Sequence, residues 1–331
     1  MGIGAELRIL VTGAAGFIGS SVAALLSQQG HSVLGIDNFS SYYSIKLKIA
    51  RKEALLDPNN LNLQSIDLSD VNEVRSLFSK ESFDVVVHLA ARIEAGISFE
   101  EPTEFYSVNT GGTCNLINVM SHHGVKNLVF SSTAAVYKAK NSPILESDEK
   151  FNNSPYGNSK LCAEQAIEAS GLNYVIFRYF NLTGADPDGE FGESHEPETH
   201  LIPRMIQNLN NFQLYGTDYN TPDGTCIRDY VHVSDVAEAH INAANYLLEG
   251  NKSIIMNLGT NRGHSILEMI TALEQITNQK VTYTVNPRRS GDADSLVADT
   301  TIAKEVLKYS PKYDIIDILK TAYEWHNGNK D

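Results

Sequence analysis

The feature that most constrains this chain is the stretch from Arg8 to Asn38, RILVTGAAGFIGSSVAALLSQQGHSVLGIDN. An apolar run over 9–11 is short enough for a buried parallel strand. Residues 20–29 have a helical pattern that Gly30 ends, and 33–36 form a second apolar run. The order is therefore strand, glycine-rich turn, helix, strand and acid, which predicts a dinucleotide-binding unit.

The three glycines of the turn each have a physical role in that unit. Gly13 permits the tight turn, Gly16 lets the backbone approach a pyrophosphate on the helix N-terminus, and Gly19 lets the helix pack close to the sheet. Their spacing is GxxGxxG, whereas the commoner fingerprint is GxGxxG. The residues expected to line the cofactor in this turn are Gly13, Ala15, Gly16, Phe17, Ile18 and Gly19.

Acidic residues end the second and third predicted strands. Asp37 can accept hydrogen bonds from the adenosine ribose, and its carboxylate would repel a 2′-phosphate, which favours NAD over NADP. The strand over 61–66 ends in Asp67-Leu68, at the edge of the sheet where ligands bind. Asp67 either recognises the adenine amino group or caps the following helix, and the sequence leaves both interpretations open.

The repeated alternation of strands and helices predicts an α/β fold with a doubly wound, mostly parallel Rossmann-type sheet. One expected helix runs over 102–121. After 186–199, an acidic loop rich in Pro and Gly, the pattern changes to a smaller C-terminal α/β lobe. We therefore predict an NAD-binding domain over 1–181 and a second, smaller lobe over 182–331, with strand exchange between them.

Composition narrows the possible partners. The net charge of −14 argues against nucleic acid and anionic membranes as partners. The three cysteines show neither a disulfide framework nor metal-ligand spacing, and no apolar segment approaches transmembrane length. We expect a cytoplasmic protein, and we predict no metal site.

Tyr156 and Lys160 lie four residues apart on one predicted helix, so their side chains share a face. A nearby ammonium stabilises a phenolate, and an oxidised nicotinamide would add to that effect, so the pair predicts a general base near neutral pH. Thr133 follows a strand that ends in Ser131-Ser132. Its hydroxyl can hydrogen-bond the substrate oxygen that Tyr156 deprotonates, and it can relay the proton of that oxygen.

Six motifs extend over nearly the whole chain: TGAAGFIG, SSTAAVY, SPYGNSK, RYFNLTGA, GTCIRDYVHV and PRRSGD. Together they resemble the extended short-chain dehydrogenase/reductases, and within these the enzymes that epimerise nucleotide sugars. The resemblance implies bound NAD and inversion of C4 in a UDP-hexose. It implies that Tyr156 takes the C4 hydroxyl proton while hydride passes to the nicotinamide. The 4-keto sugar then turns over, and hydride returns to its opposite face.

The resemblance also implies that the lobe over 182–331 binds the nucleotide sugar, and it implies two sets of binding residues. Beyond the glycine-rich turn, the cofactor set is Asp37, Asn38, Asp67, Leu68, Leu89, Ala90, Ala91, Asn109, Ser131, Tyr156, Lys160 and Tyr179. The substrate set is Thr133, Asn181, His200, Leu201, Tyr215, Arg228, Arg289, Asp292 and Leu296.

At two positions the chain departs from the family pattern. Ile93, with Arg92 beside it, stands where many members have Lys. Leu296 stands where members restricted to hexoses without an N-acetyl group have a Tyr. Because Leu is shorter than Tyr, an N-acetylhexosamine pair is a further expected substrate.

Other functions remain open at this level. Nucleotide-sugar dehydratases and decarboxylases need an acid directly after the Thr, and Ala134 stands there. A UDP-glucuronate 4-epimerase, or another UDP-sugar-modifying member of the superfamily, stays possible because SSYYSIKLKIAR resembles the corresponding segment of the uronate enzymes. A non-catalytic NAD-binding regulator would be expected to lose Tyr156 or Lys160.

Surplus apolar residues on the two helices over 102–121 and from Ser154 predict a homodimer.

Overall fold

The computed structural model describes residues 6–41, 44–56, 61–138, 140, 143–151, 154–189, 191–195, 198–289 and 292–328. Two compact units make up the chain. The first comprises Met1–Tyr137, Lys150–Arg178 and Ala237–Met256, and the second comprises Lys138–Glu149, Tyr179–Val236 and Asn257–Asp331. The sequence predicts one change of domain at residue 181 with strand exchange, whereas these units alternate along the chain.

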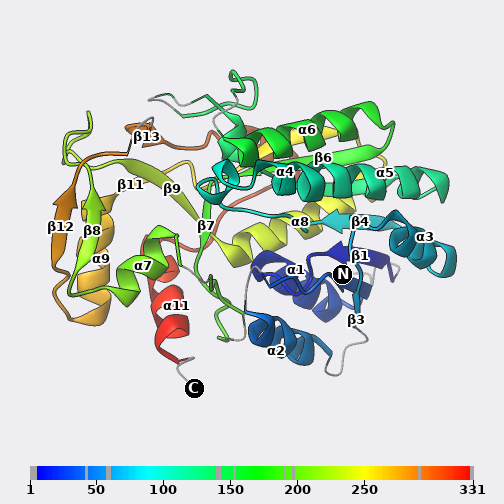
Figure 1. Ribbon diagram of the computed structural model, residues 1–331, viewed down its shortest axis with the longest axis horizontal. Coiled ribbons are helices and arrows are strands. Elements are labelled where there is room, and N and C mark those ends of the chain that lie inside the picture. Colours follow the sequence, from blue (N-terminus) through cyan, green and yellow to red (C-terminus); the bar gives the residue numbers. More distant parts are fainter. Residues whose placement is uncertain are drawn as a thin grey trace. The chain divides into compact units, whose positions relative to one another are not determined.

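The first unit contains a seven-stranded sheet in the order β3-β2-β1-β4-β5-β6-β10 (Figure 1). Its strands are β1 (Arg8–Thr12), β2 (Ser32–Asp37), β3 (Asn62–Ser65), β4 (Val85–His88), β5 (Asn127–Thr133), β6 (Asn173–Tyr179) and β10 (Ile254–Leu258). The pairings of β1 with β2 and β4, of β2 with β3 and of β4 with β5 are parallel. The predicted Rossmann-type sheet is therefore confirmed, and the late strand β10 extends it beside β6.

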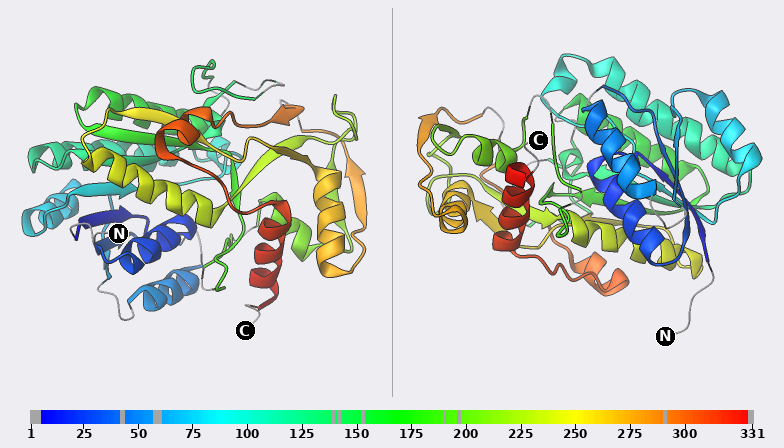
Figure 2. Two further views of the ribbon diagram at one scale, coloured as in Figure 1. Left: turned by 180° about the vertical axis from the view of Figure 1, so that it is seen from behind. Right: turned by 90° about the horizontal axis from the view of Figure 1, so that it is seen from below.

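Helices cover both faces of this sheet (Figure 2). They are α1 (Phe17–Gln28), α2 (Ile45–Leu56), α3 (Val71–Lys80), α4 (Pro102–Phe105), α5 (Gly112–His122), α6 (Pro155–Ala169) and α8 (Val233–Leu248), with short turns η1 (Ile97–Phe99) and η3 (Ala134–Val136). Alternate strand residues such as Leu10, Val86 and Phe130 pack with α3, α5 and α6 in one apolar core. On the opposite face, Phe177 of β6 meets His240 of α8 with ring centroids 5.1 Å apart.

The expected helix over 102–121 has a different geometry in its middle. Residues Tyr106–Gly111 form a π-helical segment, η2, between α4 and α5. π-helical turns often mark functional sites, because the wider turn redirects a side chain. Here the redirected segment contains Asn109, which is buried.

The second unit has smaller sheets. Strand β9 (Ile227–His232) pairs with β7 (Asn181–Thr183), β11 (Gly263–Ser265) and β13 (Ser295–Leu296), while β8 (Phe212–Tyr215) pairs with β12 (Tyr283–Asn286). The helices are α7 (Leu201–Gln207), α9 (Ile266–Thr277), α10 (Thr301–Leu307) and α11 (Ile315–Gly328). Apolar residues of α7, α9 and α11 form the core of this unit. Ser265 and Glu268 make the predicted capping box at the start of α9.

Among the helices that the structure describes, none combines the length and the apolar character needed to cross a bilayer.

Candidate active site

At Gly13 and Gly19 of the glycine-rich turn, the packing leaves no room for a side chain. Gly13 has φ +70°, and a Cβ there would lie 2.8 Å from the backbone nitrogen of Ala90. A Cβ on Gly19 would lie 2.0 Å from the carbonyl oxygen of Gly13. Helix α1 begins after Gly16 with no side-chain cap and no acid in its first turn. The turn therefore presents an open helix N-terminus, which fits a pyrophosphate.

Asp37, at the end of β2, lies directly beside this turn. Its Oδ2 accepts a hydrogen bond from the Ala15 backbone N–H at 3.3 Å, and its Oδ1 accepts one from the Phe39 backbone N–H at 2.8 Å. Lys48 Nζ also donates to Oδ1, at 3.1 Å, and both side chains of this ion pair are buried. The sequence analysis missed Lys48, which balances the charge of the predicted ribose-binding carboxylate.

Asp67 lies beside Asn38, as expected for neighbouring strand ends. Asn38 Nδ2 donates to Asp67 Oδ2 at 3.0 Å. The N-cap of α3 is Asp70, which accepts from the Asn72 backbone N–H, so helix capping belongs to Asp70. Hydrogen bonds from Ser69 and Asn38 lower the pKa of Asp67, although burial alone would raise it. The adenine-recognition interpretation stays a prediction.

A buried histidine fixes the end of β4. Thr12 Oγ1 accepts the backbone N–H groups of Leu89 and Ala90 at 3.2 and 3.1 Å, so its own hydrogen is free for His88 Nδ1 at 2.7 Å. His88 Nε2–H then donates to Thr113 Oγ1 at 2.9 Å. Burial, with a smaller effect of the Lys160 charge, lowers the pKa of His88 to about 3, so this histidine is neutral. The sequence analysis did not identify it.

Asn109 joins the segment after β4 to helix α6. Its Oδ1 accepts the Arg92 N–H at 2.8 Å, and its Nδ2 donates to the Arg92 carbonyl at 2.9 Å and to Ser159 Oγ at 3.0 Å. The Arg92 guanidinium pairs with Glu101 at 2.6 Å and lies 5.1 Å from the Phe105 ring centroid. Its head group is therefore held by α4 and the residue before it.

The predicted catalytic residues meet within the first unit. Ser154 caps α6 by accepting the Gly157 backbone N–H, and this places Tyr156 in the first turn of the helix. The Thr133 side chain hydrogen-bonds the Tyr156 phenol. Lys160, one turn further on, is buried with its Nζ 4.4 Å from the centre of the Phe130 ring. Thr133, Tyr156 and Lys160 are thus held by β5 and α6.

Burial shifts the pKa values of both Tyr156 and Lys160. Burial raises the pKa of Tyr156 above its ordinary value, and the Thr133 hydrogen bond opposes this rise only in part. Burial also lowers the pKa of Lys160 to about 7, while the Glu164 carboxylate acts in the opposite direction. Burial of both groups disfavours their charged forms, so a phenolate near neutral pH needs the additional positive charge of an oxidised nicotinamide, and the predicted general base stays a prediction.

A buried ion pair lies behind these residues, and the sequence analysis missed it. Arg178 on β6 pairs with Glu164 on α6 through two hydrogen bonds, of 3.0 and 2.6 Å. Ser132 Oγ donates to the same carboxylate, and Arg178 Nη1 donates to the Tyr137 hydroxyl at 2.9 Å. The pair fixes α6 against β5 and β6, the elements that hold Tyr156 and Thr133.

In the second unit, Arg228 and Asp292 form an ion pair between β9 and the segment before β13. Arg228 Nη1 also donates to the Ala293 carbonyl at 3.0 Å, and Tyr219 donates to Asp292 Oδ2 at 3.0 Å. Leu296 is the register partner of Arg228 in the pairing of β13 with β9. The structure therefore groups three residues of the predicted substrate set.

The other predicted substrate residues of this unit lie on neighbouring elements. Arg289 lies over the Tyr215 ring, with Cζ 4.8 Å from its centre. Asn181 Nδ2 donates to the Asp229 carbonyl on β9 at 3.1 Å. His200 is the N-cap of α7 and Leu201 its first residue. Of the remaining cofactor set, Leu68, Ser131 and Tyr179 are buried, and Leu89, Ala90 and Ala91 are half-buried.

The comparison with known proteins identifies the family to which this fold and this site belong. The sequence matches the model of the NAD dependent epimerase/dehydratase family over residues 9–259, and the chain belongs to this family.

Relatives of nearly the same length specify the branch of the family. The UDP-glucose 4-epimerase of Lacticaseibacillus casei is 40% identical over 335 aligned positions, which cover 98% of each chain. A crystal structure of UDP-glucose 4-epimerase from Stenotrophomonas maltophila, with bound NAD and formylated UDP-arabinopyranose, has a TM-score of 0.92 at 34% identity and covers 98% of each chain. The UDP-Glc/GlcNAc 4-epimerase of Campylobacter jejuni has a TM-score of 0.85 at 33% identity, with 98% of this chain and 100% of that one covered. Within its family, the chain belongs with the UDP-glucose 4-epimerases.

Proposed function

We propose that the chain interconverts UDP-galactose and UDP-glucose by inverting C4 of the hexose with NAD as cofactor. The observation that carries this proposal is the Thr133–Tyr156–Lys160 group, which lies in the same unit as a glycine turn that fits a dinucleotide. An oxidation and reduction at one carbon needs a proton acceptor that later returns the proton, and a tyrosine phenol can do both. The relatives do not favour the uronate alternative.

Tyr156 accepts the C4 hydroxyl proton and later returns it to the C4 oxygen of the product. NAD, when bound, supplies the acceptor and donor of the C4 hydride and a positive charge that favours the phenolate. Thr133 holds the phenol by a hydrogen bond and lies where it can contact the same substrate oxygen. Lys160 in its ammonium form stabilises the phenolate, and Glu164 supports that form.

The second unit is proposed as the nucleotide-sugar-binding part of the protein. Arg228 and Arg289 present guanidinium groups, which pair with diphosphates through two parallel hydrogen bonds. Asp292 holds Arg228 and accepts from Tyr219. In its complex with the UDP-sugar, Arg228 exchanges part of this pairing for the diphosphate.

The substrate range follows from Leu296. This side chain is half-buried beside Arg228 in the β13–β9 register. A Leu is shorter than a Tyr and has no phenol, so we propose that the pocket accepts an N-acetyl group at C2. The enzyme then acts on UDP-N-acetylgalactosamine as well as on UDP-galactose.

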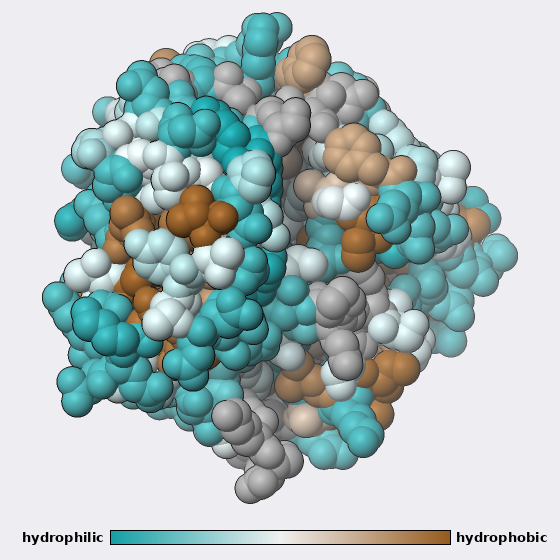
Figure 3. All heavy atoms as spheres, turned by 60° about the vertical axis from the view of Figure 1, so that its left-hand side comes forward, coloured by the Kyte–Doolittle hydropathy of each residue, from teal (hydrophilic) through white to brown (hydrophobic). Residues whose placement is uncertain are grey.

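We propose a homodimer that uses the helices α4, α5 and α6. Phe105, Ile117 and Ile167 of these helices are buried in the subunit core. Phe99 and Phe151, just before α4 and α6, are 64% and 52% exposed. The face drawn in Figure 3, on the side of β8 and β12 in Figure 1 and not on that of α5 and α6, is mainly hydrophilic, with hydrophobic side chains in separate patches. Two copies would bury the exposed phenylalanines in a four-helix interface, and a monomeric mass by light scattering at micromolar concentration would contradict this.

The three cysteines are free, which accords with a reducing compartment, so we place the protein in the cytoplasm.

Incubation with separate UDP-sugars, without added NAD, tests the proposed activity. We expect UDP-glucose from UDP-galactose, UDP-N-acetylglucosamine from UDP-N-acetylgalactosamine, and no turnover of UDP-glucuronate. Turnover of UDP-glucuronate alone would identify a uronate epimerase. No turnover of any sugar by protein that retains NAD would identify a non-catalytic binding protein.

A further inference from the structure

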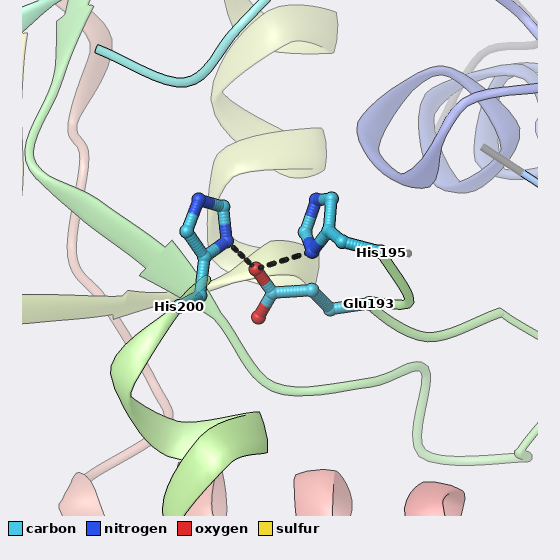
Figure 4. A group of neighbouring side chains, drawn as sticks. All are labelled: Glu193, His195 and His200. Atoms are coloured by element: carbon cyan, nitrogen blue, oxygen red, sulfur yellow. Dashed lines mark hydrogen bonds and ion pairs between the residues drawn. The ribbon is translucent and has the colours of Figure 1, made fainter. Parts of the chain in front are cut away.

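A cluster of histidine and glutamate side chains lies in the second unit, in the segment between β7 and α7. Glu193, His195 and His200 point toward one another from that segment (Figure 4). The Nδ1 atoms of both histidines face Oε1 of Glu193, at 3.7 Å for His195 and in direct contact for His200. One nitrogen or carboxylate oxygen from each residue lies within 4.8 Å of the others.

The carboxylate of this cluster is held in place by its neighbours. Thr183 Oγ1 donates to Oε2 of Glu193 at 3.2 Å, which leaves Oε1 facing the two imidazoles. Trp325 Nε1 on α11 donates to the Glu193 backbone carbonyl at 3.0 Å. Glu193 is almost completely buried. Such outer contacts are typical of metal ligands, because they orient the ligand before the metal arrives.

Two further polar atoms beside the cluster are buried without a hydrogen-bond partner among the described residues. One is Oε2 of Glu198, whose side chain is only 6% exposed and whose Oε1 lies 3.3 Å from His195 Nδ1. The other is Nε2 of His326 on α11. The charges of Glu193 and Glu198 both act on His326, so all these groups share one environment. Buried carboxylate and imidazole atoms without partners are costly unless a ligand satisfies them.

We propose that Glu193, His195 and His200 bind a zinc ion, with Glu198 as an additional oxygen ligand. Imidazole and carboxylate are ligands that Zn²⁺ prefers, and two ligands at ~2.1 Å in tetrahedral geometry lie about 3.4 Å apart. The distances from His195 Nδ1 to the two glutamates, 3.3 and 3.7 Å, bracket that separation. The site is structural, because its protein ligands fill the coordination sphere. The prediction from the cysteines that the chain has no metal site did not consider this cluster.

The proposed ion would fix the start of α7. His200 is the N-cap of that helix, but its side chain makes no capping hydrogen bond. A metal bound to His200 and to the buried Glu193 would tie α7 to the segment after β7. This inference does not depend on the proposed epimerase activity, because metal binding is measured without turnover.

The test uses the full chain with its NAD and with any affinity tag removed. The protein is stripped with dipicolinate and titrated with ZnCl₂, and binding is followed by calorimetry and metal analysis. The variant His195→Gln removes one ligand. The matched control replaces His122 and His123, two neighbouring exposed histidines with ring centroids 5.6 Å apart, by Gln.

We expect the wild type and the control to bind about one zinc ion per chain with submicromolar affinity, and zinc to raise the melting temperature of both. His195→Gln should weaken binding on the order of 100-fold. Equal binding by wild type and His195→Gln, or no binding by the wild type, would overturn the proposal and leave a hydrogen-bonded His–Glu network. Should His195→Gln not fold, the visible spectrum of the Co²⁺-loaded wild type decides. Intense four-coordinate bands support the site, and weak six-coordinate bands contradict it.

Discussion

Replacing Gly157 by alanine tests whether the contact between α6 and η3 positions Tyr156. A Cβ at residue 157 would lie 2.5 Å from the Ala135 carbonyl oxygen and 3.1 Å from its carbonyl carbon. Because carbon contacts are favourable near 3.5 Å, α6 and η3 must separate by about 1 Å. Tyr156 precedes this residue, so it moves away from Thr133. A misplacement of ~1 Å in a catalytic group can reduce turnover about 100-fold.

The free energy of unfolding of the same variant should fall by up to about 3 kcal/mol. Alanine favours a helix over glycine by up to about 1 kcal/mol, while the clash costs roughly 1–3 kcal/mol. Gly111→Ala is the matched control, since its Cβ would lie 3.8 Å from the Tyr106 carbonyl oxygen, an ordinary contact. Initial rates with UDP-galactose and urea unfolding measure both effects. Gly157→Ala with full turnover would refute the idea that this contact positions the phenol.

Three further substitutions test separate parts of the site. Tyr156→Phe should lower turnover by about 10²–10⁴-fold and leave NAD content unchanged, because the ring packs but holds no proton; near-normal rates would rule out the phenol as the base. Glu164→Gln should reduce the free energy of unfolding by about 3–5 kcal/mol in urea titrations, because Arg178 is left buried without its partner; a loss below ~1 kcal/mol would count against that pairing. Leu296→Tyr should depress activity on UDP-N-acetylgalactosamine more than on UDP-galactose, and an equal loss on both would place Leu296 outside the sugar site.

Features with a local signal could be predicted from the sequence. The turn of Gly13, Gly16 and Gly19 follows from backbone geometry, so the residue types alone indicate it. The chain length that separates Asp37 from that turn predicts it as the ribose ligand. Helical spacing relates Tyr156 to a lysine on the same face, and this predicts it as the base.

Features that join distant segments could not be predicted. Lys48 meets Asp37 only because α2 lies beside the end of β2, and the sequence marks it as one of several basic residues on that helix. Arg178 and Glu164 read separately as a strand residue and a helix residue, and only the packing of α6 on the sheet pairs them. His88 follows an apolar run in the sequence, which gives no sign of its contacts with Thr12 and Thr113.

The pKa of the Tyr156 phenol is a further property that the sequence alone does not predict. Spacing predicts that Lys160 lies near Tyr156, but it gives no measure of how deeply either side chain is buried. Burial changes both pKa values in the direction that disfavours charge. The sign of the effect therefore needs the fold.

The proposed function requires that one carbon, C4 of a UDP-hexose, is oxidised and reduced again within a single bound complex. The most direct test is incubation with UDP-[4-²H]galactose in ordinary water, followed by mass and NMR analysis of the product. We expect UDP-glucose that retains deuterium at C4, because the hydride returns to the carbon it left. Loss of the deuterium to solvent, or inversion at any other carbon, would contradict it.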